Sequence, residues 1–283
     1  MKYGIVVDSG CDLRVPPAGE GLIDFTRVPL KLDIGEQQFV DDFDLDVPGF
    51  MAAMYAHKGR TGSAAPSPHT WLSAYEKSEN VFVITITGSL SGSFASAQVA
   101  AKMFREQYPE RNIYLIDSKS AGAEISLLAH RLAELMLEGL EFSAIRSHIN
   151  EYQRRTYLLF ALQSMENLIK NGRVSRLAGN IAGILGIKIL GIASDEGTLE
   201  LLHKLRGKLK VYDKMIAEML ERGYNGGRVI IGHCFNQEAA DYLAENIRSR
   251  FRDCEIHIMP TSGLCSYYAE RGGILLGFEG AKR

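Results

Sequence analysis

Hydroxyl side chains gather in residues 81–97, whose sequence is VFVITITGSLSGSFASA. An apolar run opens this segment, which carries Thr85, Thr87, Ser89, Ser91, Ser93 and Ser96. The pattern predicts a buried strand that turns into a helix beginning near Gly92. The first turn of a helix offers backbone N–H groups without helical partners, and hydroxyls add donors that rotate to fit. The segment could therefore bind a carboxylate or a phosphate.

A simpler interpretation is that Ser89 or Ser91 only caps the helix, for which one hydroxyl is enough. The number of hydroxyls favours a binding site. Two further segments have the same character. Residues 59–73 (GRTGSAAPSPHTWLS) form a turn-rich stretch that leads into a short helix near His69, and residues 171–175 (NGRVS) place a glycine turn beside Arg173. On spacing alone, Arg173 could equally be a surface charge.

Length and composition limit the class of protein. The chain has 283 residues, 46% of them hydrophobic, which is enough for two globular domains. Its formal charge of −2, from 32 basic and 34 acidic residues, argues against nucleic-acid and anionic-membrane partners. The four cysteines lack metal-ligand spacing and suggest no disulfide framework, which fits a reducing cytosol. We see no export signal or membrane-spanning segment, so a cytoplasmic protein is expected.

The periodicity of apolar residues predicts the strands and helices that position these groups. Strands are predicted at residues 3–7, 81–87, 113–116, 157–162, 228–232 and 255–259. Helical stripes of apolar residues lie between them, at Leu128, Leu132, Leu135 and Met136 and at Ala239, Leu243 and Ile247. This alternation predicts parallel βαβ units, in which ligands bind at the carboxyl ends of strands. Residues 87–93 fall at such an end.

One region departs from this alternation. Residues 28–33 and 37–40 flank Gly35-Glu36 and predict a hairpin. An acidic run follows it, made of Asp41, Asp42, Asp44 and Asp46. The run could hold a cation, although irregular acidic clusters on loops are more often solvated surface, and no metal is expected. The polar, basic residues 152–156 mark a domain boundary, which divides the chain into residues 1–155 and 156–283.

Together these pieces resemble the DegV family of bacterial fatty-acid-binding proteins. Residues 8–12 (DSGCD) resemble the family's DS-x-x-D turn, and residues 63–67 (SAAPS) its TSQPS loop. Residues 87–97 (TGSLSGSFASA) match its SSxLSGTYxSA segment, the most specific similarity. Residues 116–118 (IDS) and 171–175 (NGRVS) resemble its strand-end Asp-Ser/Thr and its GGR(I/V)S segment. Residues 268–272 (YAERG) replace its His-x-Gly-Pro-Gly turn.

The resemblance implies an α/β fold of two domains, the first with a mostly parallel sheet flanked by helices and the second with a mixed sheet and helices. It implies a non-enzymatic carrier, without a cofactor, that binds a long-chain fatty acid between them. Some members present the acid to an ATP-dependent fatty acid kinase. The ligand-binding positions that correspond in this chain are Ser63, Ser91, Gly92, Ser93, Arg173 and Tyr268. If Tyr268 replaces the family's histidine, its phenol can still donate a hydrogen bond but does not titrate near neutral pH.

Other functions are compatible with the same residues. A serine-dependent hydrolase would need a base, for which His233 after a strand is the candidate, but the chain has no G-x-S-x-G elbow. A binder of a phosphorylated small molecule could use the same hydroxyls without an apolar tunnel. The basic residues Lys204, Arg206, Lys208 and Lys210, with Arg173, are either a solvated face at a helix start or a docking patch for an acidic partner.

Overall fold

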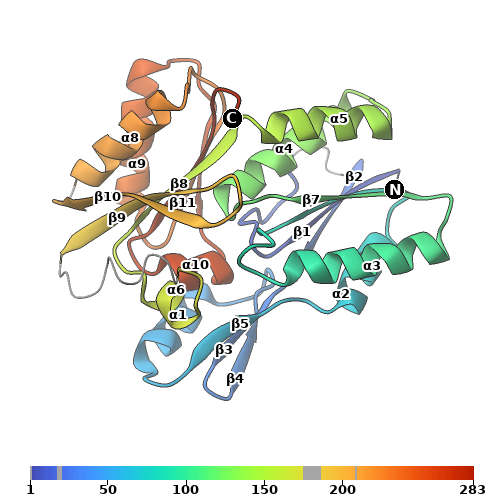
Figure 1. The fold of residues 1–283 in the computed structure, drawn as a ribbon, viewed down its shortest axis with the longest axis horizontal. Coiled ribbons are helices and arrows are strands. Elements are labelled where there is room, and N and C mark those ends of the chain that lie inside the picture. The colour runs from blue at the N-terminus through green and yellow to red at the C-terminus, as the bar shows by residue number, and fades with distance from the viewer. Residues whose placement is uncertain (1, 18–20, 175–185, 208) are drawn as a thin grey trace.

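The first sheet has the strand order β2-β1-β6-β7, and all its neighbouring strands are parallel. The computed structural model describes residues 2–17, 21–174, 186–207 and 209–283 (Figure 1). The strands of this sheet are β1 (Tyr3–Asp8), β2 (Ile23–Val28), β6 (Asn80–Thr85) and β7 (Asn112–Asp117). The predicted parallel βαβ arrangement is confirmed. The ends of β1, β6 and β7 each lie within two residues of the predicted ends.

Side chains alternate between the two faces of this sheet, and each face is covered by helices. The helices are α2 (Pro68–Tyr75), α3 (Ser93–Gln107), α4 (Ala123–Leu137) and α5 (Phe142–Gln153). Val6 and Val83 pack with α2 and α3, whereas Ile5 and Ile84 pack with α4 and α5. This period of two is the ordinary geometry of a strand buried on both faces.

The second sheet is mixed, with the order β10-β9-β8-β13-β11-β12. Its strands are β8 (Thr156–Leu162), β9 (Ile187–Ala193), β10 (Leu199–Arg206), β11 (Val229–His233), β12 (Ile256–Pro260) and β13 (Ile274–Glu279). β11 and β12 are parallel, and the other neighbours are antiparallel. Helices α8 (Lys210–Glu221) and α9 (Gln237–Arg250) cover one face, with the predicted stripe Ala239, Leu243 and Ile247 buried against it. The mixed second sheet is thus confirmed.

Helix α4 lies between the two large sheets. It contacts β1 and β6 of the first sheet and β8, β11 and β13 of the second. Its predicted stripe, Leu128, Leu132, Leu135 and Met136, is buried, and so are most of its other residues. A helix that is apolar on nearly all sides is stable where protein surrounds it, which explains why this helix sits at the centre of the molecule (Figure 1).

A third, smaller sheet has the antiparallel order β4-β3-β5. Its strands are β3 (Lys31–Ile34), β4 (Gln37–Val40) and β5 (Thr61–Ala64). The predicted hairpin is confirmed and turns at Gly35, whose φ is +59°. Its first strand begins at Lys31 rather than at residue 28, because Val28 still belongs to β2. Helices α1 (Val47–Ala56), α6 (Glu166–Lys170) and α10 (Gly263–Ala269) lie beside this sheet (Figure 1).

Several strands are absent from the sequence prediction. For residues 59–73 the sequence predicts turns followed by a short helix. The helix is present as α2, but Thr61–Ala64 form the strand β5 instead of a turn. The sequence Thr-Gly-Ser-Ala has weak strand propensity, and its pairing with β3 makes it a strand. β2, β9, β10 and β13 were also missed. Strands of the first and third sheets precede residue 156 and those of the second begin at Thr156, while the division into domains 1–155 and 156–283 stays a prediction.

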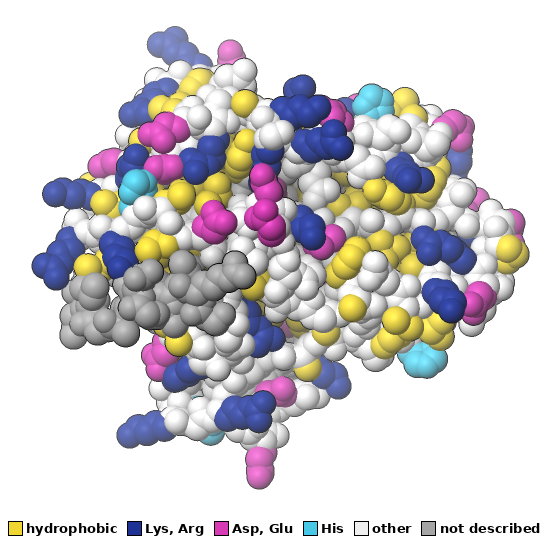
Figure 2. All heavy atoms as spheres, in the orientation of Figure 1, with side chains coloured by type: hydrophobic (Ala, Val, Ile, Leu, Met, Phe, Trp, Pro, Cys, Tyr) yellow, Lys and Arg dark blue, Asp and Glu magenta, His cyan; other side chains and the backbone are white. Residues whose placement is uncertain are grey.

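Basic and acidic side chains are interspersed over the face shown in Figure 2. Of the predicted basic run, Lys204 and Arg206 lie on β10 and Lys210 begins α8, while Lys208 lies outside the described residues. In the described part of the chain, no helix combines the length and the apolar character needed to cross a bilayer.

Candidate ligand-binding site

A narrow cavity lies where the three sheets approach α6 and α10, and the empty space in and around it is ≈ 700 Å³. Most of its wall is apolar. The apolar lining comes from Leu30, Ile86, Leu90, Ala121, Leu158, Phe160, Leu162, Leu168, Leu199, Leu264, Cys265, Ala269 and Leu275. Its polar lining consists of Ser63, Ser91, Arg173 and Tyr268.

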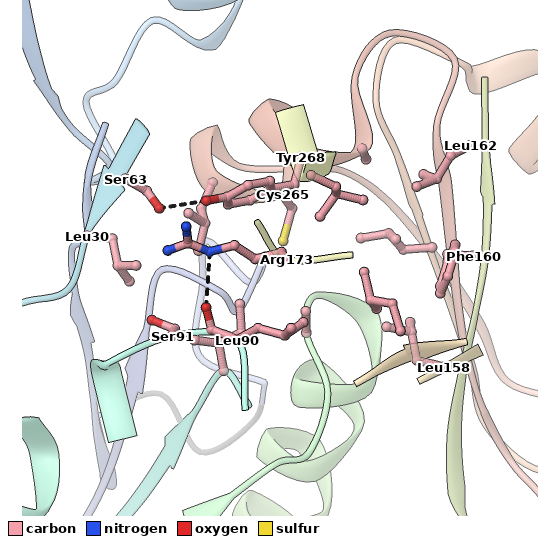
Figure 3. Close-up of a pocket in the computed structure, with 17 residues that line it drawn as sticks. Leu30, Ser63, Leu90, Ser91, Leu158, Phe160, Leu162, Arg173, Cys265 and Tyr268 are labelled. Carbon is pink, nitrogen blue, oxygen red and sulfur yellow. Dashed lines mark hydrogen bonds between the residues drawn. The ribbon is translucent and has the colours of Figure 1, made fainter. Parts of the chain in front are cut away.

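The polar side chains gather at one end of the cavity. Figure 3 shows Ser63, Ser91 and Arg173 near one another, with Leu158, Phe160 and Leu162 at the opposite end. We call these the head end and the tail end. The structure thus brings four sequence-predicted residues together, although they are separated by up to 205 positions in the chain.

Ser63 and Tyr268 face each other across the head end. Their hydroxyl oxygens are 2.9 Å apart and form a hydrogen bond. Ser63 lies on β5, where pairing with Leu32 of β3 fixes its direction. Tyr268 lies on α10. Burial raises the pKa of Tyr268 above its ordinary value of 10, while the Ser63 hydrogen bond and the Arg173 charge act in the opposite direction. The phenol therefore stays neutral and able to donate a hydrogen bond at physiological pH.

Arg173 is held at the head end by two carbonyl groups. Its Nε donates to the Leu90 carbonyl at 3.3 Å, and an Nη1 proton goes to the Asn171 carbonyl. The chain turns at Gly172, whose φ is +71°, and the Arg173 amide donates to the Leu168 carbonyl at 2.9 Å. This local turn places the guanidinium beside the loop that carries Ser91. Ser175, the last residue of the NGRVS motif, lies outside the described residues.

Ser91 combines the two roles considered for the hydroxyl segment. Its Oγ lines the cavity and also accepts a hydrogen bond from the Ser93 amide at 3.2 Å, in the first turn of α3. Helix α3 begins at Ser93, next to the predicted start near Gly92. Neither Gly92 nor Ser93 belongs to the residues described as lining the cavity, so their contact with a ligand stays a prediction.

Other hydroxyls of the segment hold the protein together. Thr87 donates to the Gly197 carbonyl at 2.9 Å, and Ser89 donates to the Glu196 carbonyl at 2.5 Å, so both bind the turn between β9 and β10. Ser96 donates to the Pro66 carbonyl at 2.6 Å. The density of hydroxyls therefore reflects docking of neighbouring segments as well as the cavity.

The DSGCD turn supports the site without lining it. Asp8 accepts hydrogen bonds from the Ser93 hydroxyl at 2.6 Å and from the Ile86 amide at 3.0 Å. Asp12 accepts from the Ser262 amide at 2.7 Å, just before α10. Burial raises the pKa of each carboxyl from 3.8 to about 6, against the lowering effect of these hydrogen bonds. The turn thus fixes the starts of α3 and α10.

The acidic run after the hairpin acts within the fold. Asp41 is buried, pairs with Arg27 at 3.1 Å and accepts the Gly263 and Leu264 amides at the start of α10. Asp46 caps α1 through the Gly49 amide. Among the described residues, no group of three or more His, Cys, Asp or Glu side chains could hold a metal ion.

The hydrolase interpretation requires a base close to Ser91. His233 ends β11, is 8% exposed and accepts a hydrogen bond from the Asn236 amide at 3.3 Å. The residues described as lining the cavity include no histidine or carboxylate. The arrangement is suited to binding an anion attached to a long apolar group, because an arginine and neutral hydroxyls lie at one end of an apolar cavity.

Sequence reasoning missed the tail end. Leu158, Phe160 and Leu162 alternate along β8 and therefore share one face of the strand. That alternation is visible in the sequence. However, Leu159 and Ala161 between them are equally apolar and pack with α8 and α9 on the other face, so the sequence could not show which face lines a cavity.

The sequence model of a family described as "Uncharacterised protein, DegV family" matches residues 2–279. A DegV domain-containing protein of Streptococcus pyogenes (serotype M18) is 46% identical over 279 residues, which cover 99% of this chain and 100% of that protein.

Solved structures agree with the family match. The Streptococcus pneumoniae Fatty Acid Kinase (Fak) B3 protein, loaded with linoleic acid, is 44% identical and has a TM-score of 0.96, with 99% of this chain and 100% of that chain covered. A DegV family protein from Eubacterium eligens, loaded with heptadecanoic acid, is 36% identical with a TM-score of 0.93 and the same coverage.

Proposed function

The chain belongs to the DegV family, and on that premise we propose that it binds a long-chain fatty acid with the carboxylate at the head end. The observation that carries the proposal is a cavity with Ser63, Ser91, Arg173 and Tyr268 at one end and apolar side chains elsewhere. Relatives of this fold bind linoleic and heptadecanoic acids, which supports the assignment of the ligand class.

Physical chemistry favours this ligand over a small anion. A carboxylate is costly to bury unless its oxygens receive hydrogen bonds, which Arg173 and the Ser63, Ser91 and Tyr268 hydroxyls can donate. Each buried CH₂ of the tail contributes roughly 0.8 kcal/mol. A phosphorylated small molecule would use the head end but leave the leucine-rich tail end without a partner.

We further propose that the protein works in the cytoplasm as a carrier that presents the carboxylate to an ATP-dependent fatty acid kinase. Residues around the head end, including Ala64, Ala65, Gly92 and Gly172, are exposed, whereas Leu158 and Phe160 at the tail end are buried. A kinase could therefore reach the carboxylate while the tail stays covered. The chain itself supplies binding and protection, and the partner supplies ATP and catalysis.

Mass spectrometry of small molecules released from the denatured protein tests the binding. We expect a fatty acid in a molar ratio near one in the wild type, and much less in Ser63→Ala/Ser91→Ala. Ser73→Ala/Ser147→Ala is a matched control, because these serines donate to carbonyls within their own surface helices. Absence of a fatty acid from every protein, together with no uptake of added oleate, would contradict the proposal.

Presentation is tested by adding ATP and a fatty acid kinase to the loaded protein and measuring acyl phosphate. We expect acyl phosphate from loaded protein and little from an equal amount of free fatty acid without it. Equal rates with and without this protein would show that it binds the acid but does not present it.

A further inference from the structure

Three short elements carry side chains to the head end, and no single sheet positions all of them. Ser63 lies on the edge strand β5, Arg173 follows the turn after α6, and Tyr268 lies on α10. A carboxylate has to be reached by these groups at once. Some contact must therefore fix β5, the turn and α10 relative to one another.

The phenol of Tyr267 makes that contact. Its oxygen is 2.7 Å from the Thr61 hydroxyl on β5, two residues before Ser63. It also accepts a hydrogen bond from the Asn171 side-chain amide at 2.8 Å, two residues before Arg173. Because the phenol accepts the amide proton, its own proton can be donated to Thr61. One buried oxygen thus joins β5 to the turn that carries Arg173.

The rest of Tyr267 is equally well fixed. The residue is 0% exposed, and its carbonyl accepts a hydrogen bond from the Asn167 side chain of α6 at 2.8 Å. Its ring packs edge-on against the ring of Tyr268, with centroids 4.7 Å apart, and lies tilted beside the ring of Phe50 on α1, with centroids 6.3 Å apart. Tyr267 does not belong to the residues described as lining the cavity. It therefore contacts the elements that carry Ser63, Arg173 and Tyr268 without facing a ligand itself.

We infer that Tyr267 is a positioning residue that gives the site its preference for a carboxylate over a neutral head group. The inference rests on the proposed fatty-acid binding. Charge-assisted hydrogen bonds depend on distance and angle, so a small displacement of β5 or of the Arg173 turn weakens them. Tail binding depends on buried apolar area and tolerates such a displacement.

The test compares oleate with oleyl alcohol, which has the same tail and no charge. Delipidated wild type and Tyr267→Phe, which keeps the ring, are titrated with each ligand by competition against a fluorescent fatty acid. We expect Tyr267→Phe to lose about tenfold affinity for oleate, or about 1.4 kcal/mol, because the two hydrogen bonds that fix β5 and the Arg173 turn are lost. The affinity for oleyl alcohol should change less than about twofold.

Two variants separate positioning from a general loss of structure. Tyr75→Phe is the matched control, since that buried phenol donates to the Ala97 carbonyl and neither residue is among those described as lining the cavity; it should bind both ligands as the wild type does. Thr61→Val removes one partner of Tyr267 and should lower oleate affinity by a smaller factor, with little further loss when combined with Tyr267→Phe.

Equal losses for oleate and oleyl alcohol in Tyr267→Phe, or no loss for either, would overturn the positioning role. Additive losses in the double variant would overturn it as well. Failure of the wild type to bind oleate would instead contradict the proposed function, so the two failures are distinguishable.

Discussion

The two ends of the cavity are built in different ways. The head end takes one polar side chain from each of four segments: β5, the loop before α3, the turn after α6 and α10. The tail end takes alternate residues of β8, with further apolar residues from other strands of the same sheet, such as Leu199 of β10 and Leu275 of β13. The head end is therefore an assembly of separate pieces, and the tail end is largely one face of a sheet.

This difference follows from the forces involved. Hydrogen bonds and ion pairs are directional, so each head-end residue has a particular task and a particular support, such as Asp8, Asp12 and Tyr267. Burial of apolar surface has no preferred direction, so several leucines contribute together to binding of the tail. Loss of the charged head-end side chain, Arg173, should accordingly matter more than a single substitution at the tail end.

The largest effect is expected at Arg173. Arg173→Ala removes the one cation among the residues described as lining the cavity and leaves a bound carboxylate without its charge partner. We expect about a hundredfold loss of oleate affinity, or about 2.7 kcal/mol, in a fluorescence competition assay. Arg173→Lys keeps the charge but not the planar fork and should recover part of the affinity. If Arg173→Ala binds oleate as tightly as the wild type, Arg173 does not contact the carboxylate.

The next largest effect sharpens the description of the tail end. Leu158→Trp fills part of the buried tail end, and we expect about a thirtyfold loss of stearate affinity from steric conflict, or about 2 kcal/mol. Laurate, which has a shorter tail, should bind nearly as before. Leu158→Met conserves the volume and serves as the control. Equal losses for stearate and laurate would indicate that the tail does not reach Leu158.

A third prediction concerns pH. The folded pKa of Asp12, about 6, lies above its ordinary value of 3.8 because of burial, so the folded chain retains a proton that the unfolded chain loses. Stability should therefore fall as the pH rises from about 4 to about 6, by up to about 1.4 kcal/mol per pH unit from this group. Asp12→Asn keeps an acceptor for the Ser262 amide and should flatten the slope in urea unfolding.

The same experiment compares the two ends of the cavity. Leu158→Met changes the tail end, which contains no titratable side chain among its described lining residues, and should keep the wild-type slope. An Asp12→Asn slope as steep as that of the wild type would mean that Asp12 does not retain its proton in the folded protein.

The smallest effect is expected for Tyr268→Phe. The ring remains and a neutral hydrogen-bond donor is lost, so oleate affinity should fall only about threefold, or about 0.7 kcal/mol. Because burial raises the pKa of Tyr268, the wild-type phenol stays protonated and its contribution should be constant between about pH 6 and 9. Tyr108→Phe, which removes a surface phenol bound to Glu76, is the control. A loss of oleate affinity as large as that of Arg173→Ala would show that the Tyr268 phenol is a main contact of the carboxylate.

Much of the fold could be predicted from the sequence where the signal is local. The strands β1, β6, β7, β8, β11 and β12 and the apolar stripes of α4 and α9 are contiguous or periodic, so they are visible without knowledge of neighbours. β5 could not be predicted, because its Thr-Gly-Ser-Ala sequence becomes a strand only through pairing with β3. β10 is amphipathic and contains a bulge near His203, which interrupts the alternation of its side chains.

The sequence by itself determined the chemistry of the site: serine hydroxyls before a helix, an arginine after a glycine turn, and motifs specific enough to indicate the DegV family. Tertiary structure decided which of these groups meet. In the folded chain Ser91 lines the cavity, whereas Thr87 and Ser89 bind the turn between β9 and β10. The face of β8 that carries Phe160 forms part of the tail end. The reason is physical: residue type and local pattern fix what a side chain can donate or bury, whereas packing of distant segments fixes what it faces.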